Sequence, residues 1–160
     1  MPKILALNGV HTAGKSTLGE ILRDEESFNY VPEIAQELID DEKGVDWGDE
    51  GDHEFQSAIH EGETKRDRQI LQNGADHAVV ETWHFGNTAH SMETAKESLV
   101  KEQEEYIRVL NQNPDIELYA VFFDMDLEKI WDRSPHFEEG NKNIIQFYDN
   151  VRENHFELYE

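Results

Sequence analysis

Short apolar runs alternate along the chain with longer segments in which apolar residues recur at every third or fourth position. Short runs that end at glycine or at polar residues are typical of buried strands, and the longer period is typical of helices that pack one face against a sheet. The predicted strands are 3–8, 30–31, 78–81 and 116–123. The predicted helices are 14–25, 34–39, 53–72, 98–111, 127–133 and 143–159. Within 98–111, the residues expected to face the core are Leu99, Tyr106, Val109 and Leu110.

Three segments lack either period. Residues 40–52 are acidic and rich in glycine, and residues 134–140 are polar and contain Pro135, so both are predicted loops. Residues 82–94 mix Trp, His, Gly and Asn, which predicts a loop that leads into a helical turn.

Strands that alternate with helices predict a parallel sheet with helices on both faces, because parallel strands need a long crossover between them. The chain has 160 residues and shows no internal repeat, low-complexity linker or domain break. We therefore predict one α/β domain of three layers, α/β/α, over residues 1–160.

The N-terminus enters the first predicted strand at Lys3 without the features of a signal peptide. No apolar run approaches the ~20 residues that a membrane span needs. The chain has no cysteine, which excludes disulfides and thiolate metal sites. We expect a cytoplasmic protein with no membrane partner.

The charge of the chain is strongly negative, with 36 Asp and Glu against 14 Lys and Arg and a net charge of −22. Nucleic acid is disfavoured as a partner, because neutralising phosphates requires clustered basic residues. The acidic residues are spread through segments that also carry regular apolar positions, which indicates a folded protein. This pattern predicts a halophilic protein, since salt screens the repulsion among carboxylates; an ordinary acidic protein is the alternative.

Residues 9–16 read GVHTAGKS and match G-x-x-x-x-G-K-[ST], a pattern that binds the phosphates of a nucleoside triphosphate. The glycines let successive backbone N–H groups point into one concavity, and the helix that follows adds its positive end. Lys15 is expected to be solvated without ligand and to reach the β- and γ-phosphates, and the Ser16 hydroxyl to ligate Mg²⁺. The expected nucleotide-binding residues are Gly9, His11, Thr12, Ala13, Gly14, Lys15, Ser16 and Thr17.

Three shorter motifs follow the phosphate loop in order: Val31-Pro32-Glu33 after the second strand, Phe55-Gln56 on the long helix, and Val79-Val80-Glu81 ending the third strand. With these motifs the sequence resembles the P-loop kinases of nucleosides and nucleotides, above all the deoxynucleoside and thymidylate kinases and related metabolite kinases. The resemblance covers nearly the whole chain. It implies the P-loop kinase fold, with the first strand central in the sheet.

The resemblance also implies roles for single residues. Glu33 matches the glutamate that acts as base toward the substrate hydroxyl, and Gln56 matches a glutamine that contacts the base of a bound nucleoside. Glu81 matches the acidic residue that orients Mg²⁺ and its waters. For Glu33 the alternative is a helix-start residue favoured by the helix dipole, and for Gln56 it is a solvent-facing side chain.

The chain departs from the family pattern in three places. Thr82 stands where related kinases have an arginine after the acidic residue. Arg133 matches the arginines of the family's lid, but it is the only arginine there, and a helix-end arginine is the alternative. The chain ends at Glu160 without a fifth strand, so we expect either a minimal version of the fold or an incomplete wall around the adenine.

The eight histidines show no paired spacing with carboxylates that favours a metal site. Trp83 and His84 follow Glu81 closely, and we expect both of them to border the acceptor pocket.

These patterns predict an ATP- and Mg²⁺-dependent kinase that phosphorylates a nucleoside-like acceptor, with Lys15, Glu33 and Arg133 as catalytic residues. One alternative is a nucleoside monophosphate kinase of the thymidylate type. The other is a nucleotide-binding switch or regulatory NTPase without a small-molecule acceptor. The acceptor and the preference for ATP over GTP stay open, and a homodimer is compatible with the sequence.

The net charge of −22 generates a prediction about salt. The melting temperature should rise steeply between dilute and molar KCl, because the Debye length falls to about 3 Å at 1 M and repulsion among carboxylates is screened. Differential scanning calorimetry across that range measures the effect. A melting temperature that stays flat would contradict the halophilic interpretation.

Overall fold

The computed structural model describes residues 1–9, 13–41, 53–74, 76–126, 129 and 142–159. The strands are β1 (Lys3–Gly9), β2 (Asn29–Val31), β3 (His77–Glu81) and β4 (Glu117–Phe123). The helices are α1 (Lys15–Glu26), α2 (Ile34–Asp41), α3 (His53–Gln72), α4 (His84–Thr94), α5 (Glu97–Asn111) and α7 (Lys142–Tyr159). The predicted loop 40–52 was wrong at residues 40 and 41, which belong to α2, and its other residues lie outside the described ones. The predicted loop 134–140, and the predicted helix 127–133 apart from Lys129, also lie outside the described residues.

The described strands form one parallel sheet in the order β2-β3-β1-β4, so the first strand is interior, as predicted. Leu7 pairs with Glu81 of β3, and Gly9 pairs with Phe123 of β4. The carboxyl ends of β1 and β3 therefore meet at one edge of the sheet. In parallel α/β sheets this edge is where ligands bind.

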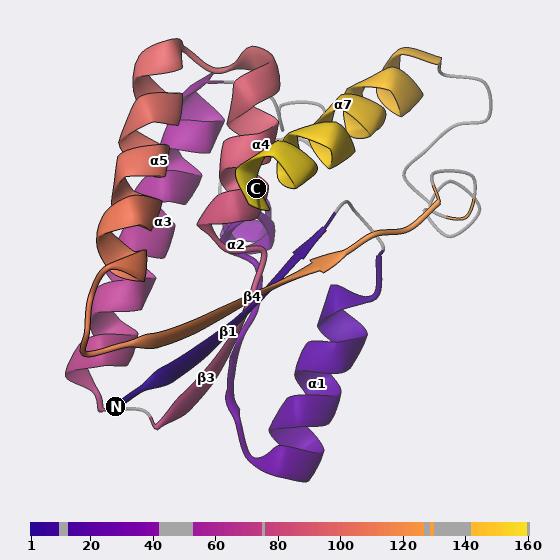
Figure 1. Cartoon of the computed structure of the whole chain (residues 1–160). Coiled ribbons are helices and arrows are strands. Elements are labelled where there is room, and N and C mark those ends of the chain that lie inside the picture. The colour runs from indigo at the N-terminus through magenta and orange to yellow at the C-terminus, as the bar shows by residue number, and fades with distance from the viewer. Residues whose placement is uncertain (10–12, 42–52, 75, 127–128, 130–141, 160) are drawn as a thin grey trace.

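Helices cover both faces of the sheet, which confirms the predicted three layers. In Figure 1, α1 lies on one side of the strands, and α3, α4 and α5 lie on the other. Ile4 pairs with Ala78 and Ala6 with Val80. All four are buried in one cluster with Ile70 of α3, because alternate residues of neighbouring strands point to the same face.

Helix α4 occupies most of the segment that was predicted to be a loop, so that prediction was wrong. The helix packs against α3, α5, α7 and β1, and it is buried on almost every side. One of its small polar residues is satisfied within the helix, since the Thr88 hydroxyl donates to the His84 carbonyl oxygen at 2.7 Å. A helix without a solvent face has no polar stripe, and its sequence therefore shows no helical period.

Helix α5 differs from the prediction at one inward position. Leu99 is buried and Leu110 packs against the core cluster, as expected, but the Val109 side chain is 52% exposed. The buried residue between them is polar, Gln103. The face of α5 that points toward the core includes Gln103. The prediction considered only apolar residues and therefore placed Val109 on this face, although it is exposed.

The start of α4 is tied to two other elements by Asn8, the fully buried residue before Gly9. Its carboxamide oxygen accepts from the backbone N–H groups of Trp83 at 3.0 Å and Gly86 at 3.3 Å. Its amide nitrogen donates to the Tyr159 hydroxyl at the end of α7, at 2.9 Å. One side chain thus joins the end of β1 to the first turn of α4 and the last turn of α7.

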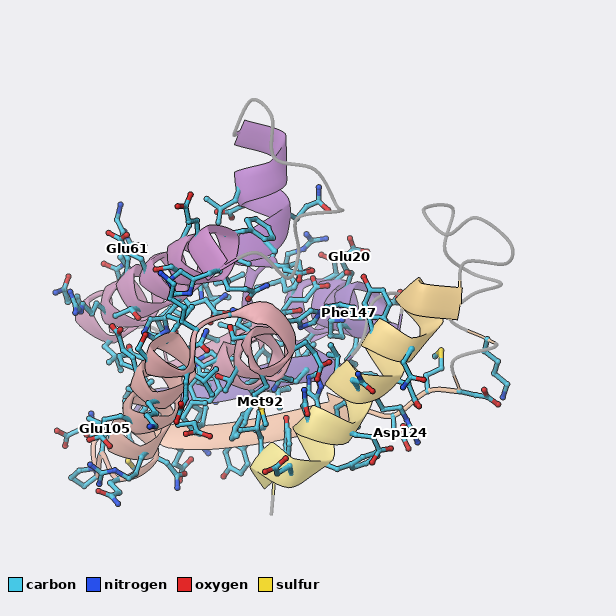
Figure 2. All side chains as sticks on the ribbon, turned by 90° about the horizontal axis from the view of Figure 1, so that it is seen from above. Glu20, Glu61, Met92, Glu105, Asp124 and Phe147 are labelled. Atoms are coloured by element: carbon cyan, nitrogen blue, oxygen red, sulfur yellow. The ribbon has the colours of Figure 1, made fainter. Side chains whose placement is uncertain are left out.

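Acidic side chains are spread over the surface rather than gathered on one face. Figure 2 shows Glu20, Glu61, Glu105 and Asp124, all exposed, on four separate elements or connections. No helix in the described part of the chain is long and apolar enough to cross a membrane.

The contact between α1 and β2 generates a prediction at Gly19. A Cβ atom at this position would lie 2.3 Å from Cε2 of Tyr30, so the ring lies directly over the glycine. Gly19→Ala gains about 1 kcal/mol of helix propensity, but overpacking costs about 1–3 kcal/mol. The free energy of unfolding from urea titration should therefore fall by about 1 kcal/mol.

The control is the same change in a Tyr30→Ala background, where the ring is gone. There Gly19→Ala should stabilise the protein by about 1 kcal/mol, as in an ordinary exposed helix. Equal effects in both backgrounds would show that the ring does not constrain Gly19.

Candidate functional site

The phosphate loop starts and ends at glycines with backbone angles that L side chains rarely adopt. Gly9 has φ of 148° and Gly14 has φ of 98°. A Cβ atom on Gly9 would also lie 2.9 Å from the carbonyl oxygen of Phe123. These positions therefore require glycine. His11 and Thr12 lie outside the described residues.

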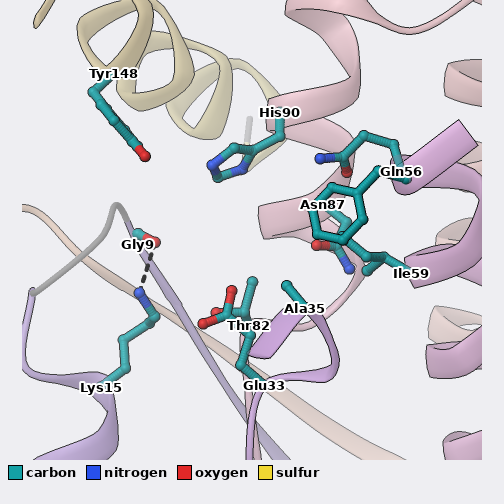
Figure 3. Close-up of a pocket in the computed structure, with 11 residues that line it drawn as sticks. Gly9, Lys15, Glu33, Ala35, Gln56, Ile59, Thr82, Asn87, His90 and Tyr148 are labelled. Atoms are coloured by element: carbon teal, nitrogen blue, oxygen red, sulfur yellow. Dashed lines mark hydrogen bonds between the residues drawn. The ribbon is translucent and has the colours of Figure 1, made fainter. Parts of the chain in front are cut away.

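Lys15 begins α1 and is 6% exposed, so the expectation that it is solvated without ligand was wrong. Its ammonium group donates a hydrogen bond to the Gly9 carbonyl oxygen at 3.0 Å (Figure 3). The ammonium group therefore lies at the carboxyl end of β1, which is the end where the pattern places the phosphates.

Glu81 lies at the end of β3 and is 6% exposed. Its Oε1 accepts a hydrogen bond from the Ser16 hydroxyl at 2.5 Å. Its Oε2 accepts one from the Tyr30 hydroxyl, also at 2.5 Å. Burial raises the pKa of Tyr30, and the Glu81 carboxylate raises it further, so the phenol stays protonated and donates. The structure brings Ser16 and Glu81 together, as the metal assignment requires.

The residues near Ser16 fit a Mg²⁺ ion. A serine hydroxyl and a carboxylate oxygen are ligands of the kind that Mg²⁺ takes, with the remaining positions filled by phosphates and water. Within the described residues there is no group of three or more His, Asp or Glu side chains placed to hold a metal. This donor set suits an ion that arrives with a nucleotide better than an ion caged by protein.

Glu33 stands directly before α2 and lines two neighbouring pockets. One pocket has a volume of about 450 Å³ and also contains Ser16, Tyr30 and Glu81. The other also contains Lys15 and Gln56. Burial raises the pKa of Glu33, an effect opposed by the nearby Lys15 charge and increased by Glu81.

The second pocket has an apolar wall and a polar wall (Figure 3). The apolar wall is formed by Ala35, Phe55 and Ile59. The polar wall is formed by Gln56, Asn87, His90 and Tyr148. Gln56 is 2% exposed, so it is not the solvent-facing residue of the alternative interpretation. The free volume is about 30 Å³, the space of about one water molecule.

His90 presents a hydrogen-bond acceptor to the second pocket. Its Nδ1 lies 2.8 Å from the Gly86 carbonyl oxygen, and because a carbonyl only accepts, Nδ1 carries the hydrogen. Burial lowers the pKa of His90, and the charge of Lys15 lowers it further, so the ring is neutral. The lone pair is then on Nε2. His90 and Asn87 escaped the sequence analysis because α4 was not recognised as a helix.

Trp83 and His84 lie away from both pockets, in the protein interior. The indole N–H of Trp83 lies 3.3 Å from Asp67 Oδ2, and His84 Nε2 lies 2.7 Å from the same oxygen. His84 Nδ1 lies 3.2 Å from Glu63 Oε2, and burial raises the pKa of Glu63 to about 8. This network joins α3 to the start of α4. The expectation that Trp83 and His84 border the acceptor pocket does not match these positions.

Thr82 occupies the position of the arginine found in related kinases. It has a left-handed backbone, with φ of 47°, and lies next to Glu33 in Figure 3. Its hydroxyl lowers the pKa of Glu33. Arg66 of α3 also lowers it, but this buried guanidinium lies 3.6 Å from Glu63 and 3.7 Å from Asp67. Arg133 lies outside the described residues.

No protein-family model and no curated protein matches the chain. Solved structures do match over almost its whole length. The YorR protein of Bacillus subtilis, in complex with phosphorylated GDP, has a TM-score of 0.57 and 15% identity, over 98% of this chain and 78% of its own. Thymidylate kinase of Ehrlichia chaffeensis has a TM-score of 0.57 and 16% identity, over 99% of this chain and 81% of its own.

Deoxyadenosine kinase of M. mycoides, with bound dATP, has a TM-score of 0.59 and 13% identity, over 98% of this chain and 84% of its own. At these identities the likeness concerns the fold. The parallel sheet with β1 interior and the loop from Gly9 into α1 agree with it. The chain has the fold of the P-loop nucleoside and nucleotide kinases, as the sequence predicted.

Proposed function

We propose that this protein is an ATP- and Mg²⁺-dependent kinase that transfers the γ-phosphoryl group to a hydroxyl group of a nucleoside-like small molecule. The observation that carries the proposal is that Lys15 and Glu33 line both pockets. One pocket holds the Ser16–Glu81 pair suited to a metal nucleotide, and the other holds the buried amides of Gln56 and Asn87. A phosphoryl group passing between the two ligands would therefore pass these two side chains.

The proposed chemistry needs little from the protein beyond position and charge. The acceptor oxygen forms a bond to the γ-phosphorus, the bond to the β-phosphate oxygen breaks, and ADP leaves. Glu33 takes the proton of the acceptor hydroxyl, and Lys15 holds the transferring phosphate. Ser16 and Glu81 would hold and orient Mg²⁺, which would supply positive charge at the phosphate oxygens.

The charges of the second pocket favour an alcohol over a phosphate as acceptor. Lys15 is the only permanently charged cation among the described residues that line it, and the phosphate loop already uses that charge. His90 is neutral and offers a lone pair. An acceptor that donates hydrogen bonds, such as a nucleoside, therefore suits the polar wall of the second pocket better than a monophosphate does.

The second pocket must widen to admit a nucleoside. Its free volume of about 30 Å³ is far below the ~300 Å³ of the smallest common ligand pockets. Its apolar wall comes from α2 and α3, which pack against each other through Ile34, Ala35, Phe55 and Ile59. We propose that acceptor binding separates these two helices.

A coupled assay of ADP release tests the function. The protein is given MgATP in high-salt buffer, alone and with a panel of nucleosides and nucleoside monophosphates. Stimulation by a nucleoside supports the proposal, and stimulation by a monophosphate alone supports the thymidylate kinase alternative. ADP release that no acceptor stimulates supports the switch or regulatory NTPase.

Lys15→Ala should weaken ATP binding by about 100-fold or more, because two phosphates lose a charged hydrogen-bond donor. The loss of the bond to Gly9 should cost only about 1 kcal/mol of stability, so the fold is kept. Isothermal titration calorimetry measures the affinity, and Lys101→Ala, at an exposed lysine of α5, is the matched control. ATP affinity equal to that of the parent would contradict the phosphate-loop assignment.

Glu33→Gln should lower kcat by about 10²- to 10⁴-fold, the usual worth of a general base, with ATP affinity nearly unchanged. The parent should lose activity toward acid at a higher pH than an ordinary glutamate with pKa of about 4.3, because burial raises the pKa of Glu33 and only the ionised form accepts a proton. The variant should lack this acid limb in its profile of kcat against pH.

The matched control is Glu37→Gln, at an exposed glutamate in the first turn of α2, the helix that follows Glu33. It should leave kcat and the pH profile as they are in the parent. Unchanged kcat for Glu33→Gln on the best nucleoside would reject Glu33 as the base and leave it as a helix-start residue.

A further inference from the structure

We propose that Tyr30 is a positioning residue that holds the Glu81 carboxylate in the orientation needed at the metal site. The inference rests on the proposed function, because it gives Glu81 its task at a metal nucleotide. Nothing in the sequence pointed to Tyr30, which lies in a strand of three residues just before Val31-Pro32-Glu33.

The two oxygens of Glu81 are each held by a different hydroxyl group. Ser16 donates to Oε1 and Tyr30 donates to Oε2, both at 2.5 Å. Two donors on opposite oxygens fix both the position and the rotation of a carboxylate. Loss of either one leaves the group free to rotate about its last bond.

The two donors differ in what else they must do. The Ser16 oxygen is the protein ligand expected for Mg²⁺, so its hydroxyl would serve the ion as well as Glu81. Tyr30 has no such task, because its phenol donates to the Glu81 carboxylate and the phosphate-loop pattern does not make it a metal ligand. Tyr30 is therefore the donor that can hold Glu81 in the same orientation before and after the metal nucleotide binds.

The surroundings of Tyr30 fix the place of its hydroxyl. In the sheet, Tyr30 pairs with Val79, two residues before Glu81 on β3, which brings the phenol within reach of the carboxylate. The ring lies over Gly19 of α1, where a Cβ atom would be 2.3 Å away. Arg23, also on α1, has its guanidinium 6.0 Å from the centre of the Tyr30 ring. The ring therefore packs from β2 against α1.

Tyr30 also lines the pocket of about 450 Å³ that contains Ser16, Glu33 and Glu81. Its hydroxyl contacts the Glu81 carboxylate directly. The effect of losing it should therefore appear in properties that depend on the metal, and not in the fold.

The test is Tyr30→Phe, which removes the hydroxyl and keeps the ring over Gly19. Calorimetric titrations measure the affinity for MgATP and for ATP in EDTA, without any acceptor. The affinity for MgATP should fall by about tenfold, because a hydrogen bond to a charged group is lost. The affinity for ATP in EDTA should be unchanged. In the assay of ADP release, the Mg²⁺ concentration for half-maximal rate should rise, and kcat should recover at saturating Mg²⁺.

The matched control is Tyr119→Phe, which removes the hydroxyl of an exposed tyrosine on β4. It should not change any of these values. In a Glu81→Gln background, Tyr30→Phe should have little further effect on MgATP affinity, because both changes act through the same carboxylate.

Three results would overturn the proposal. The first is an affinity for MgATP in Tyr30→Phe equal to that of the parent. The second is an equal loss with and without Mg²⁺, which would make Tyr30 a structural residue only. The third is a parent protein that binds ATP equally well with and without Mg²⁺. That last result removes the metal assignment of Glu81 and is thereby distinct from a failure of Tyr30 alone.

Discussion

Asn8 is fully buried at the end of β1, and its carboxamide is bonded to the start of α4 on one side and to the end of α7 on the other. The next residue, Gly9, opens the phosphate loop. The same side chain therefore sets where the loop leaves the sheet and where α4 begins. Because Asn87 and His90 lie on α4 and line the second pocket, this carboxamide helps to place that pocket relative to the end of β1.

The strands could be predicted because they are short runs of buried apolar residues. Most helices could be predicted because only one of their faces is buried, which gives a regular apolar period. The bounds of α3, at His53–Gln72, match the prediction, since its ends are marked by changes in pattern. The prediction failed at α4, where burial on all sides removes the polar stripe, and at Val109, where Gln103 holds the inward position. Buried polar residues such as Gln103 cannot be recognised from hydrophobicity alone, because their side chains resemble those of solvent-facing positions.

Some residues of the site could likewise be predicted from the sequence, and others could not. Lys15 and Ser16 could be named from the phosphate-loop pattern, and Glu33 and Glu81 from the resemblance to nucleoside and nucleotide kinases. The structure brings all four around two adjoining pockets. Tyr30 and His90 could not be named. Tyr30 acts across the sheet through the register of β2 and β3, and His90 reaches the pocket from an unrecognised helix. Trp83 and His84 were named for their closeness to Glu81 in sequence, but the turn after β3 directs both into the interior.

The charges of the site explain why the proposed function would need a metal ion. Lys15 is accompanied by two carboxylates, Glu33 and Glu81, and Glu81 is close enough to raise the pKa of Glu33. A triphosphate without a cation would meet one positive and two negative groups on a chain whose net charge is −22. Mg²⁺ reduces the charge of the nucleotide and would convert Glu81 from a repulsive group into an orienting one. A fixed orientation of Glu81 would then have two effects. It would keep the carboxylate directed at the ion, and it would prevent the carboxylate from turning toward the phosphates and repelling them.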